Sequence, residues 1–240
     1  MNRVVGKRNW RVHETVVRLR RGLFCAVIFC LGLQVSGCSW FQPKKEKTAR
    51  ELAEEGMEAF KDEDYKKSIE SFEKLKDWYP FSQYAILAEL KLGDAHYQRK
   101  EYEEAIYAYE EFENLHPKNE AVPYVVYQIG RCYFDRLQAI DRDQTMTHQA
   151  VRVFTRLVRT YPASLYAKKA GEHIRVCEKN LAEHELYVAM FYYKTKHYRA
   201  ALDRFKTVLT SYPDLGVQHK ALEYIPLCQA KIDDAEHSMN

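Results

Sequence analysis

The chain has 240 residues, of which 37 are Lys or Arg, 34 are Asp or Glu and 9 are Gly. Charged residues make up 30% of the chain beside 46% hydrophobic residues, and this balance excludes a disordered chain and a polytopic membrane protein. So few Gly, together with 7 Pro, also argue against an all-β fold, which needs many turn residues.

The net charge of +3 combines two segments of opposite sign. Residues 1–37 carry seven basic side chains and one acid, Glu14, whereas the remainder carries 30 basic and 33 acidic residues. Because binding to phosphates needs a basic surface, the second segment is not expected to bind nucleic acid.

Residues 1–37 have the pattern of a secretory signal peptide. Arg18, Arg20 and Arg21 precede an apolar run from Leu23 to Val35. A helix over this run is about 20 Å long, too short for a bilayer core of about 30 Å. A basic segment, a short apolar segment and small residues at the end are typical of a signal peptide that is removed.

The sequence Val35-Ser36-Gly37-Cys38 resembles a bacterial lipobox. This resemblance implies that Cys38 is lipidated and that the chain is cleaved before it. Ser39 stands where Asp would favour retention in the inner membrane, so the resemblance implies the outer membrane. The alternative is an ordinary signal peptide followed by an unrelated cysteine. We predict a signal peptide over residues 1–37 and a lipidated linker over residues 38–49.

Beyond the linker the sequence repeats with a period of 37 residues. Seven landmark residues recur without a gap: Gly56, Tyr65, Ser68, Ile69, Phe72, Leu75 and Pro80 return as Gly93, Tyr102, Ala105, Ile106, Tyr109, Phe112 and Pro117. Two further units fit more loosely, around Gly130–Pro162 and Ala189–Pro213. Apolar residues at i, i+1, i+4 and i+7 predict an amphipathic second helix in each unit, and such a fixed period is typical of stacked helix pairs.

These landmarks resemble those of the tetratricopeptide repeat. The resemblance predicts an all-α, right-handed α-solenoid of about five helix pairs over residues 50–234, with the last pair incomplete and a flexible tail over residues 235–240. The first-helix glycines are expected to permit close packing. Ser82 and Ser164 are expected to be helix N-caps.

Three features depart from the regular repeat. The third unit carries eight extra residues around Ala139–Thr147. The stretch Leu165–Lys194 predicts either one long helix or a broken pair. The final unit, Val217–Asp234, is expected to be a single helix that contains Pro226, and its missing partner helix predicts a cap or a docking surface.

An aromatic residue recurs at equivalent points of the first helices, which line the inner face of a solenoid. The four residues are Phe60, Tyr97, Phe134 and Tyr193, and Tyr127 and Arg131 lie close to them in the sequence. They predict a groove for a peptide with aromatic side chains. The alternative is that these side chains form the core between helices.

Motifs for catalysis are absent from the sequence, which lacks GxSxG, Walker-type, HExxH and CxxC patterns. We therefore expect no enzyme activity, no cofactor and no metal site. His173 and His184 are about 16 Å apart on one helix, too far to share a metal ion. Cys132, Cys177 and Cys228 are expected to be buried small apolar residues. A disulfide or a reactive thiol remains the alternative.

Several blocks resemble the BamD family, the lipoproteins of the outer-membrane β-barrel assembly machinery. The blocks are the lipobox, YPFSQYA, YVVYQIG, DRDQTMTHQAVRVFTRLVRTYPASLYAKKA and AEHELYVAMFYYKTKHYRAAL. The resemblance covers about Cys38 to Asp234, and its most specific element is the insertion that contains Asp141, Arg142 and Asp143. It implies a lipid-anchored protein on the periplasmic side of the outer membrane.

The resemblance also implies partners. N-terminal repeats would receive unfolded outer-membrane β-barrel precursors, with Tyr79, Tyr84 and Tyr97 on the substrate side. C-terminal repeats would dock the insertase BamA, with Arg204 in an ion pair, and other assembly subunits would join them. One alternative is a tetratricopeptide lipoprotein that recruits peptidoglycan-remodelling enzymes. Another is a hydrolase or redox enzyme that uses one of the three cysteines.

Overall fold

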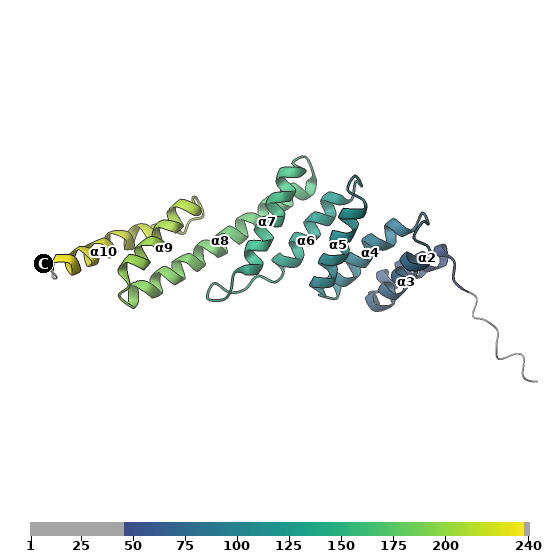
Figure 1. Ribbon diagram of the computed structural model, residues 1–240, viewed down its shortest axis with the longest axis horizontal. Coiled ribbons are helices and arrows are strands. Elements are labelled where there is room, and N and C mark those ends of the chain that lie inside the picture. Colours follow the sequence, from purple (N-terminus) through teal and green to yellow (C-terminus); the bar gives the residue numbers. More distant parts are fainter. Residues whose placement is uncertain (1–45, 238–240) are drawn as a thin grey trace, which may run out of the picture. The chain divides into compact units, whose positions relative to one another are not determined.

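The computed structural model describes residues 46–237, and all the regular elements in that range are helices. Their bounds are α2 (Ala49–Lys61), α3 (Tyr65–Trp78), α4 (Ala85–Gln98), α5 (Tyr102–Leu115), α6 (Val122–Phe134), α7 (Thr145–Thr160), α8 (Leu165–Lys194), α9 (Tyr198–Ser211) and α10 (Gln218–His237) (Figure 1). The predicted all-α class is confirmed. The signal peptide and Cys38 lie outside the described residues.

Consecutive helices pack against each other from α2 to α10, which is the arrangement of a tetratricopeptide-like solenoid. The helix pairs are α2/α3, α4/α5, α6/α7 and α8/α9, and α10 packs on α9 without a second helix of its own among the described residues. Within residues 46–237, no helix is both long and apolar enough to cross a membrane.

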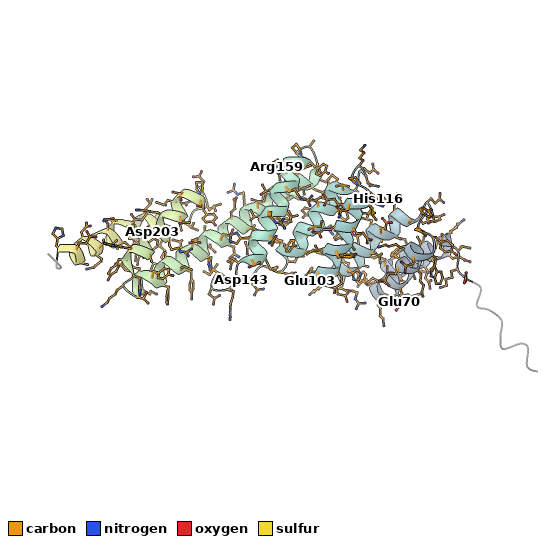
Figure 2. The ribbon with its side chains drawn as sticks, viewed as in Figure 1. Glu70, Glu103, His116, Asp143, Arg159 and Asp203 are labelled. Carbon is orange, nitrogen blue, oxygen red and sulfur yellow. The ribbon has the colours of Figure 1, made fainter. Side chains whose placement is uncertain are left out.

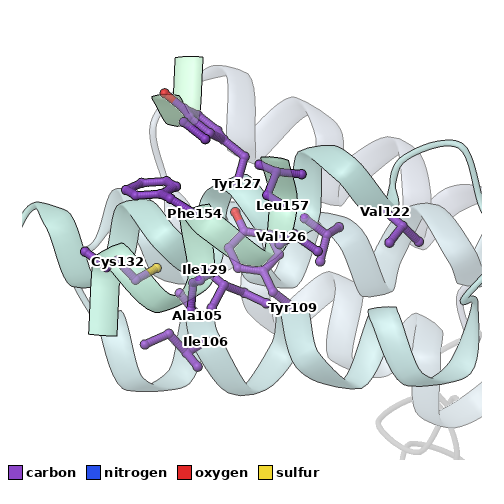
Figure 3. Close-up of a cluster of buried hydrophobic side chains, with 14 of the residues drawn as sticks. Ala105, Ile106, Tyr109, Val122, Val126, Tyr127, Ile129, Cys132, Phe154 and Leu157 are labelled. Atoms are coloured by element: carbon purple, nitrogen blue, oxygen red, sulfur yellow. The ribbon is translucent and has the colours of Figure 1, made fainter. Parts of the chain in front are cut away.

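The core consists of buried apolar side chains between neighbouring helices. In the middle of the solenoid, Tyr109 and Phe154 are fully buried together with apolar residues of α6 (Figure 3). Phe112 belongs to the same buried cluster. Similar clusters form around Phe72 between α2, α3 and α4, and around Phe205 between α8, α9 and α10. The aromatic landmark of each second helix is therefore the centre of its unit's core, which explains why it recurs.

The recurring glycines lie where an aromatic ring of the second helix touches the first helix. A Cβ atom at Gly56, Gly93 or Gly130 would lie 2.7, 2.5 or 2.3 Å from the nearest ring carbon. The rings are those of Phe72, Tyr109 and Phe154. Such distances are far below van der Waals contact, so the predicted role of these glycines in close packing is confirmed.

The turn inside three helix pairs has the same unusual backbone. Glu63, Lys100 and Lys196 occupy equivalent positions with φ of 61°, 61° and 65°, the left-handed region that side chains with a Cβ disfavour. Two hydrogen bonds close the turn; in the second unit they run from Lys100 N to Tyr97 O and from Glu101 N to His96 O, at 2.9 and 3.0 Å.

We expect Lys100→Gly to stabilise the protein, because Gly adopts the left-handed region without the steric cost. The gain should be about 0.5–1 kcal/mol, since the greater entropy of Gly in the unfolded chain offsets part of it. Urea denaturation followed by circular dichroism measures this change. The exposed Lys118→Gly is a suitable comparison, and an equal gain there would contradict the explanation.

The stretch Leu165–Lys194 is one continuous helix of 30 residues, which resolves the alternatives left open by the sequence. Its first half packs on α6 and α7 through Ala170 and Cys177, and its second half packs on α9 and α10 through Leu186 and Ala189. Buried residues recur along it, so apolar contacts support the helix in both halves. The helix therefore belongs to two repeats at once.

Of the two predicted N-caps, one is confirmed and one is wrong. The hydroxyl of Ser164 accepts a hydrogen bond from Tyr166 N and caps α8. Helix α4 begins after Tyr84 instead, and the Ser82 hydroxyl accepts a long hydrogen bond of 3.3 Å from Tyr84 N, in the turn before the helix. Two extra residues between Pro80 and the helix move Ser82 away from the cap.

Helix α10 contains Pro226, as predicted for the final unit. It continues to His237, past the predicted end of the solenoid at Asp234. The last helical turn therefore includes residues 235–237, the first part of the predicted tail.

Candidate functional site

The aromatic residues that end three first helices pack against a tyrosine that begins the next helix. The pairs are Phe60–Tyr65, Tyr97–Tyr102 and Tyr193–Tyr198, with edge-to-face rings whose centroids lie 5.4, 5.9 and 5.6 Å apart. Phe60, Tyr97 and Tyr193 are half-buried, so each ring supports the turn and also keeps part of its surface exposed. These rings therefore contribute to packing between helices, and the predicted role of their exposed parts in a peptide groove stays a prediction.

Phe134 occupies the equivalent position of the third unit but makes different contacts. Its ring packs against the His173 ring of α8 at 4.3 Å and against the Phe154 ring of α7 at 6.3 Å. The insertion between α6 and α7 replaces the short turn, and within residues 46–237 the ring of Phe134 has no tyrosine ring partner of the kind seen in the other units. The long helix α8 supplies the missing aromatic partner.

A polar network joins α4, α6 and α8 beside Phe134. The Tyr97 hydroxyl donates a hydrogen bond to Asp135, and the Arg131 guanidinium donates to the same carboxylate at 3.1 Å. The guanidinium carbon also lies 5.8 Å from the centroid of the Tyr97 ring. The Tyr127 hydroxyl is hydrogen-bonded to His173 Nε2 at 2.9 Å. The sequence did not predict that Asp135 would accept these hydrogen bonds or that His173 would be hydrogen-bonded to Tyr127.

The protonation states in this network leave Arg131 as its stable cation. Burial raises the pKa of Tyr97, and the Asp135 carboxylate raises it further. Burial also lowers the pKa of His173, helped by Arg131, so this imidazole is neutral at pH 7. For Arg131 burial is the largest single effect and opposes the charge, but the hydrogen bonds with Asp135 and Tyr127 and the nearby charges together outweigh it and raise the pKa. The raised pKa of Tyr97 keeps its hydroxyl protonated at neutral pH, so this hydroxyl can donate its hydrogen bond to Asp135.

The seven predicted groove residues fall into two groups. Tyr97, Tyr127, Arg131 and Phe134 gather around α6, where Tyr127 is only 7% exposed and belongs mainly to the core. Phe60, Tyr79 and Tyr84 pack against the core of the first unit. The Tyr79 hydroxyl donates to Lys47 O at 2.8 Å, and the Lys91 ammonium lies 4.8 Å from the centroid of the Phe60 ring.

A buried carboxylate between the two groups was not predicted. Asp94 is 5% exposed and accepts hydrogen bonds from the hydroxyls of Tyr109 at 2.8 Å and Tyr124 at 2.6 Å. Lys91 pairs with its second oxygen at 2.7 Å. Asp94 thus connects α4, α5 and α6. Its sequence signal was an acid beside Gly93, the glycine that packs under Tyr109, in an otherwise apolar stretch.

The insertion after α6 is held by the long helix. His184 Nδ1 is hydrogen-bonded to Ile140 O at 2.6 Å, and Asn180 Nδ2 donates to Gln138 O at 3.2 Å. Within the insertion, the buried side chain of Gln144 donates to two backbone carbonyls, those of Ala139 and Arg142. Of the Asp141-Arg142-Asp143 element, Asp143 accepts from Thr145 N at the start of α7, and its hydrogen bonds with Thr145 lower its pKa.

Arg204 lies on α9 and already has an intramolecular partner. Its guanidinium donates to both carboxylate oxygens of Glu185 on α8, at 3.0 and 2.9 Å. The Arg204 side chain is 45% exposed, so the pair is accessible to another protein. Also along α8, a cavity of about 330 Å³ is lined by residues that include Ile140, Tyr187 and Met190.

The three cysteines of the described region are unpaired and buried. Burial raises the pKa of Cys132 and of Cys177 to about 12, so both thiols stay protonated at neutral pH. The pKa of Cys228 shifts in the same direction for the same reason. Their expected burial as small apolar residues is confirmed. Residues 46–237 hold no cluster of His, Cys, Asp and Glu that could bind a metal ion.

Comparison with known proteins assigns the chain to a family. The family model described as outer membrane lipoprotein (YfiO) matches residues 45–233. The outer membrane protein assembly factor BamD of Caulobacter vibrioides is 29% identical over 180 residues, which cover 73% of this chain and 59% of that protein. BamD of Neisseria gonorrhoeae is 27% identical over 220 residues, which cover 85% of this chain and 82% of that protein.

Solved tetratricopeptide structures give weaker similarity. A protein from Thermus thermophilus matches with a TM-score of 0.41 and 14% identity, over 73% of this chain and 98% of that protein. One from Parabacteroides merdae gives the same TM-score and identity, over 79% and 76%. The match to the family model includes almost every helix described above, together with the insertion after α6. The chain therefore belongs to the YfiO family of outer membrane lipoproteins, the family of BamD.

Proposed function

We propose that the protein is a non-enzymatic scaffold in the assembly of outer membrane proteins. The observation that carries this proposal is the family match over residues 45–233, together with relatives that are named as outer membrane protein assembly factors. The chain spans 59% of the length of the Caulobacter relative and 82% of the gonococcal one. A solenoid of helix pairs suits a scaffold, because it offers a long surface without needing a catalytic centre.

Lipidation of Cys38 would hold the scaffold on the periplasmic face of the outer membrane. Several acyl chains give stable anchoring, since each buried CH₂ group contributes about 0.8 kcal/mol. The anchor would also raise the effective concentration of the solenoid near other membrane-bound subunits, so that weak contacts suffice.

The N-terminal repeats would receive unfolded β-barrel precursors. The exposed parts of Phe60 and Tyr97 support this role, because half-buried rings held by their neighbours offer apolar surface at little entropic cost. Arg131 adds a guanidinium plane beside Tyr97. Tyr79 and Tyr84 would extend the same surface towards the first unit, whereas the buried Tyr127 would act by supporting Arg131 and His173.

The C-terminal repeats would dock BamA. Support comes from the accessible Arg204–Glu185 pair and from exposed apolar residues of α8, Tyr187 at 49% and Phe191 at 58% exposure. In this proposal the Arg204 guanidinium leaves Glu185 and pairs with a carboxylate of BamA, or it donates hydrogen bonds to both carboxylates at once. A guanidinium has enough donors for both.

The test is recovery of BamA from detergent-solubilised membranes under native conditions with affinity-tagged protein. We expect Arg204→Glu to lower recovery of BamA about tenfold or more, because it places like charges across the interface. Lys206→Glu, at an exposed position of the same helix, should recover BamA normally. Glu185→Gln should also recover it, since Arg204 keeps its charge and loses only a competitor.

The outcomes separate the parts of the proposal. Loss of BamA with Glu185→Gln as well as Arg204→Glu would make the pair a structural support of α8 and α9. Normal recovery with all variants would keep the scaffold function and remove Arg204 from the interface. Recovery of peptidoglycan-remodelling enzymes in place of BamA by the unmodified protein would overturn the proposed function.

A further inference from the structure

A groove runs between α3 and α5 over α4, away from the residues discussed above. It encloses about 700 Å³, and its apolar lining includes Leu92 and Ala108, with Tyr107 beside them at 70% exposure. Acidic side chains dominate its walls, where one lysine, Lys76, faces five carboxylates. The carboxylates are those of Glu73, Asp77, Glu103, Glu104 and Glu111. Figure 2 labels Glu103 near the start of α5.

Two of the five carboxylates are neutralised within the chain. Lys76 pairs with Glu111 at 2.5 Å across the groove, and Arg136 pairs with Glu103 at 2.6 Å. The other three carboxylates, among residues 46–237, take part in no ion pair or side-chain hydrogen bond; they are Glu73, Asp77 and Glu104. Like charges on one groove repel each other, so the groove carries a negative potential that the fold itself does not balance.

The equivalent groove one repeat later, between α5 and α7, also contains an ion pair, but there the acidic and basic residues have exchanged helices. When the repeats are aligned by their landmark residues, Lys76 of α3 corresponds to Glu113 of α5, and Glu111 of α5 corresponds to Arg156 of α7. Glu113 and Arg156 form the corresponding ion pair at 2.5 Å. The cation of this pair therefore comes from α7, the later helix, whereas in the first groove it comes from α3.

Other positions of this second groove are also less acidic. The landmark spacing gives a neutral or basic residue at three positions of the acidic groove: Asn114 for Asp77, Gln149 for Glu104 and Arg152 for Tyr107. Of the three unbalanced carboxylates, only Glu73 has an acidic equivalent, Glu110. The excess of negative charge is thus a property of the groove between α3 and α5 and is not imposed by the repeat.

We propose that the groove between α3 and α5 binds a basic segment of a partner protein, with arginine or lysine side chains on either side of an apolar one. The occupant supplies the cations that α7 supplies in the next repeat. Its apolar side chain contacts Leu92, Ala108 and Tyr107, while its cations pair with the three unbalanced carboxylates. This surface is separate from the aromatic residues and Arg204, so the proposal does not rest on the proposed function.

The probe for the test is a fluorescein-labelled peptide of about twelve residues in which arginine and leucine recur at helical spacing. Fluorescence anisotropy reports its binding to the detergent-solubilised full chain. We expect the triple variant Glu73→Gln, Asp77→Asn, Glu104→Gln to bind about tenfold more weakly or worse, since each lost pair weakens binding by a fewfold. Tyr107→Arg, which copies Arg152 of the next repeat, should weaken binding by a similar factor.

The matched control removes the same number of carboxylates from exposed positions outside the groove. It combines Glu110→Gln, at the position equivalent to Glu73 in the second groove, with Asp203→Asn and Glu223→Gln. This variant should bind the probe as the unmodified chain does. Equal binding by the groove variant, or equal weakening by the control, would overturn the proposal. Circular dichroism verifies that each variant is folded.

Two other occupants are distinguished by the same assay. If Lys44→Gln with Lys45→Gln strengthens probe binding, the chain's own linker fills the groove and the partner proposal is wrong. If the unmodified chain dimerises and the groove variant is monomeric in sedimentation, the occupant is a second copy, which also overturns it. A probe of the same length with glutamate in place of arginine should not bind, and binding of that probe would contradict the role of charge.

Discussion

Replacing Gly130 with Ala is expected to destabilise the protein by about 2 kcal/mol. The new Cβ would lie 2.3 Å from Phe154 Cε1 and 2.6 Å from Cδ1. Phe154 is fully buried between α6, α7 and α8, so its ring cannot turn towards solvent. Overpacking of this kind costs about 1–3 kcal/mol and more when nothing can yield, while the better helix propensity of Ala returns about 1 kcal/mol.

Gly171 provides the matched control for this prediction. It also lies inside a helix, but a Cβ there would meet nothing within 4 Å. We expect Gly171→Ala to stabilise by about 0.5–1 kcal/mol through helix propensity alone. Urea denaturation followed by circular dichroism measures both variants. A loss of stability with Gly130→Ala and a gain with Gly171→Ala would support the packing explanation. Stabilisation by both substitutions would refute it.

A double variant tests the contact itself. Phe154→Leu shortens the side chain that Gly130 accommodates and alone creates a cavity. In the Gly130→Ala background it should cost less than it does in the unmodified protein, because the two residues are in contact and their effects are not additive. Additive losses would mean that the new methyl group is accommodated elsewhere.

Replacing Asp94 with Ala is expected to cost about 3 kcal/mol. The hydroxyl of fully buried Tyr109 would keep only a long contact of 3.5 Å with Gln128 Nε2, and Tyr124 would lose its shortest hydrogen bond. Removing one member of a buried polar group leaves its partners without compensation, which costs more than the net value of the bonds. The midpoint of urea denaturation reports the loss.

Two variants separate the orphaned hydroxyl from a general effect of the substitution. Tyr109→Phe in the Asp94→Ala background should recover part of the lost stability, because no buried hydroxyl is then left unpaired at this position. Asp203→Ala, at an exposed aspartate of α9 (Figure 2), should change stability by less than about 0.5 kcal/mol. No recovery with Tyr109→Phe would mean that Asp94 acts through Lys91 instead.

The helices themselves were largely predictable, because their determinants are local. The 37-residue period, the prolines and the first-helix glycines required only the sequence, and the structure places each of these glycines under an aromatic ring. Predictions at single positions were less reliable. Ser164 caps its helix but Ser82 does not, since the residue at which α4 begins depends on how the preceding turn packs.

The candidate site was predictable only as a set of residue types. An aromatic residue at each first-helix end was visible in the sequence, but the same residue type has different surroundings: Phe134 contacts His173, whereas Tyr97 contacts Tyr102. The ionic partner of Arg204, Glu185, lies on another helix and could not be inferred from spacing along one helix.

The sequence by itself determined the helical repeat and the lipobox-like motif, since periodicity and motif spacing are properties of neighbouring residues. Only the tertiary structure decided that Leu165–Lys194 is one helix, that Asp94 is a buried centre of hydrogen bonds and that one groove keeps three unbalanced carboxylates. These features depend on which side chains of different repeats meet, and the stacking of the repeats determines those contacts.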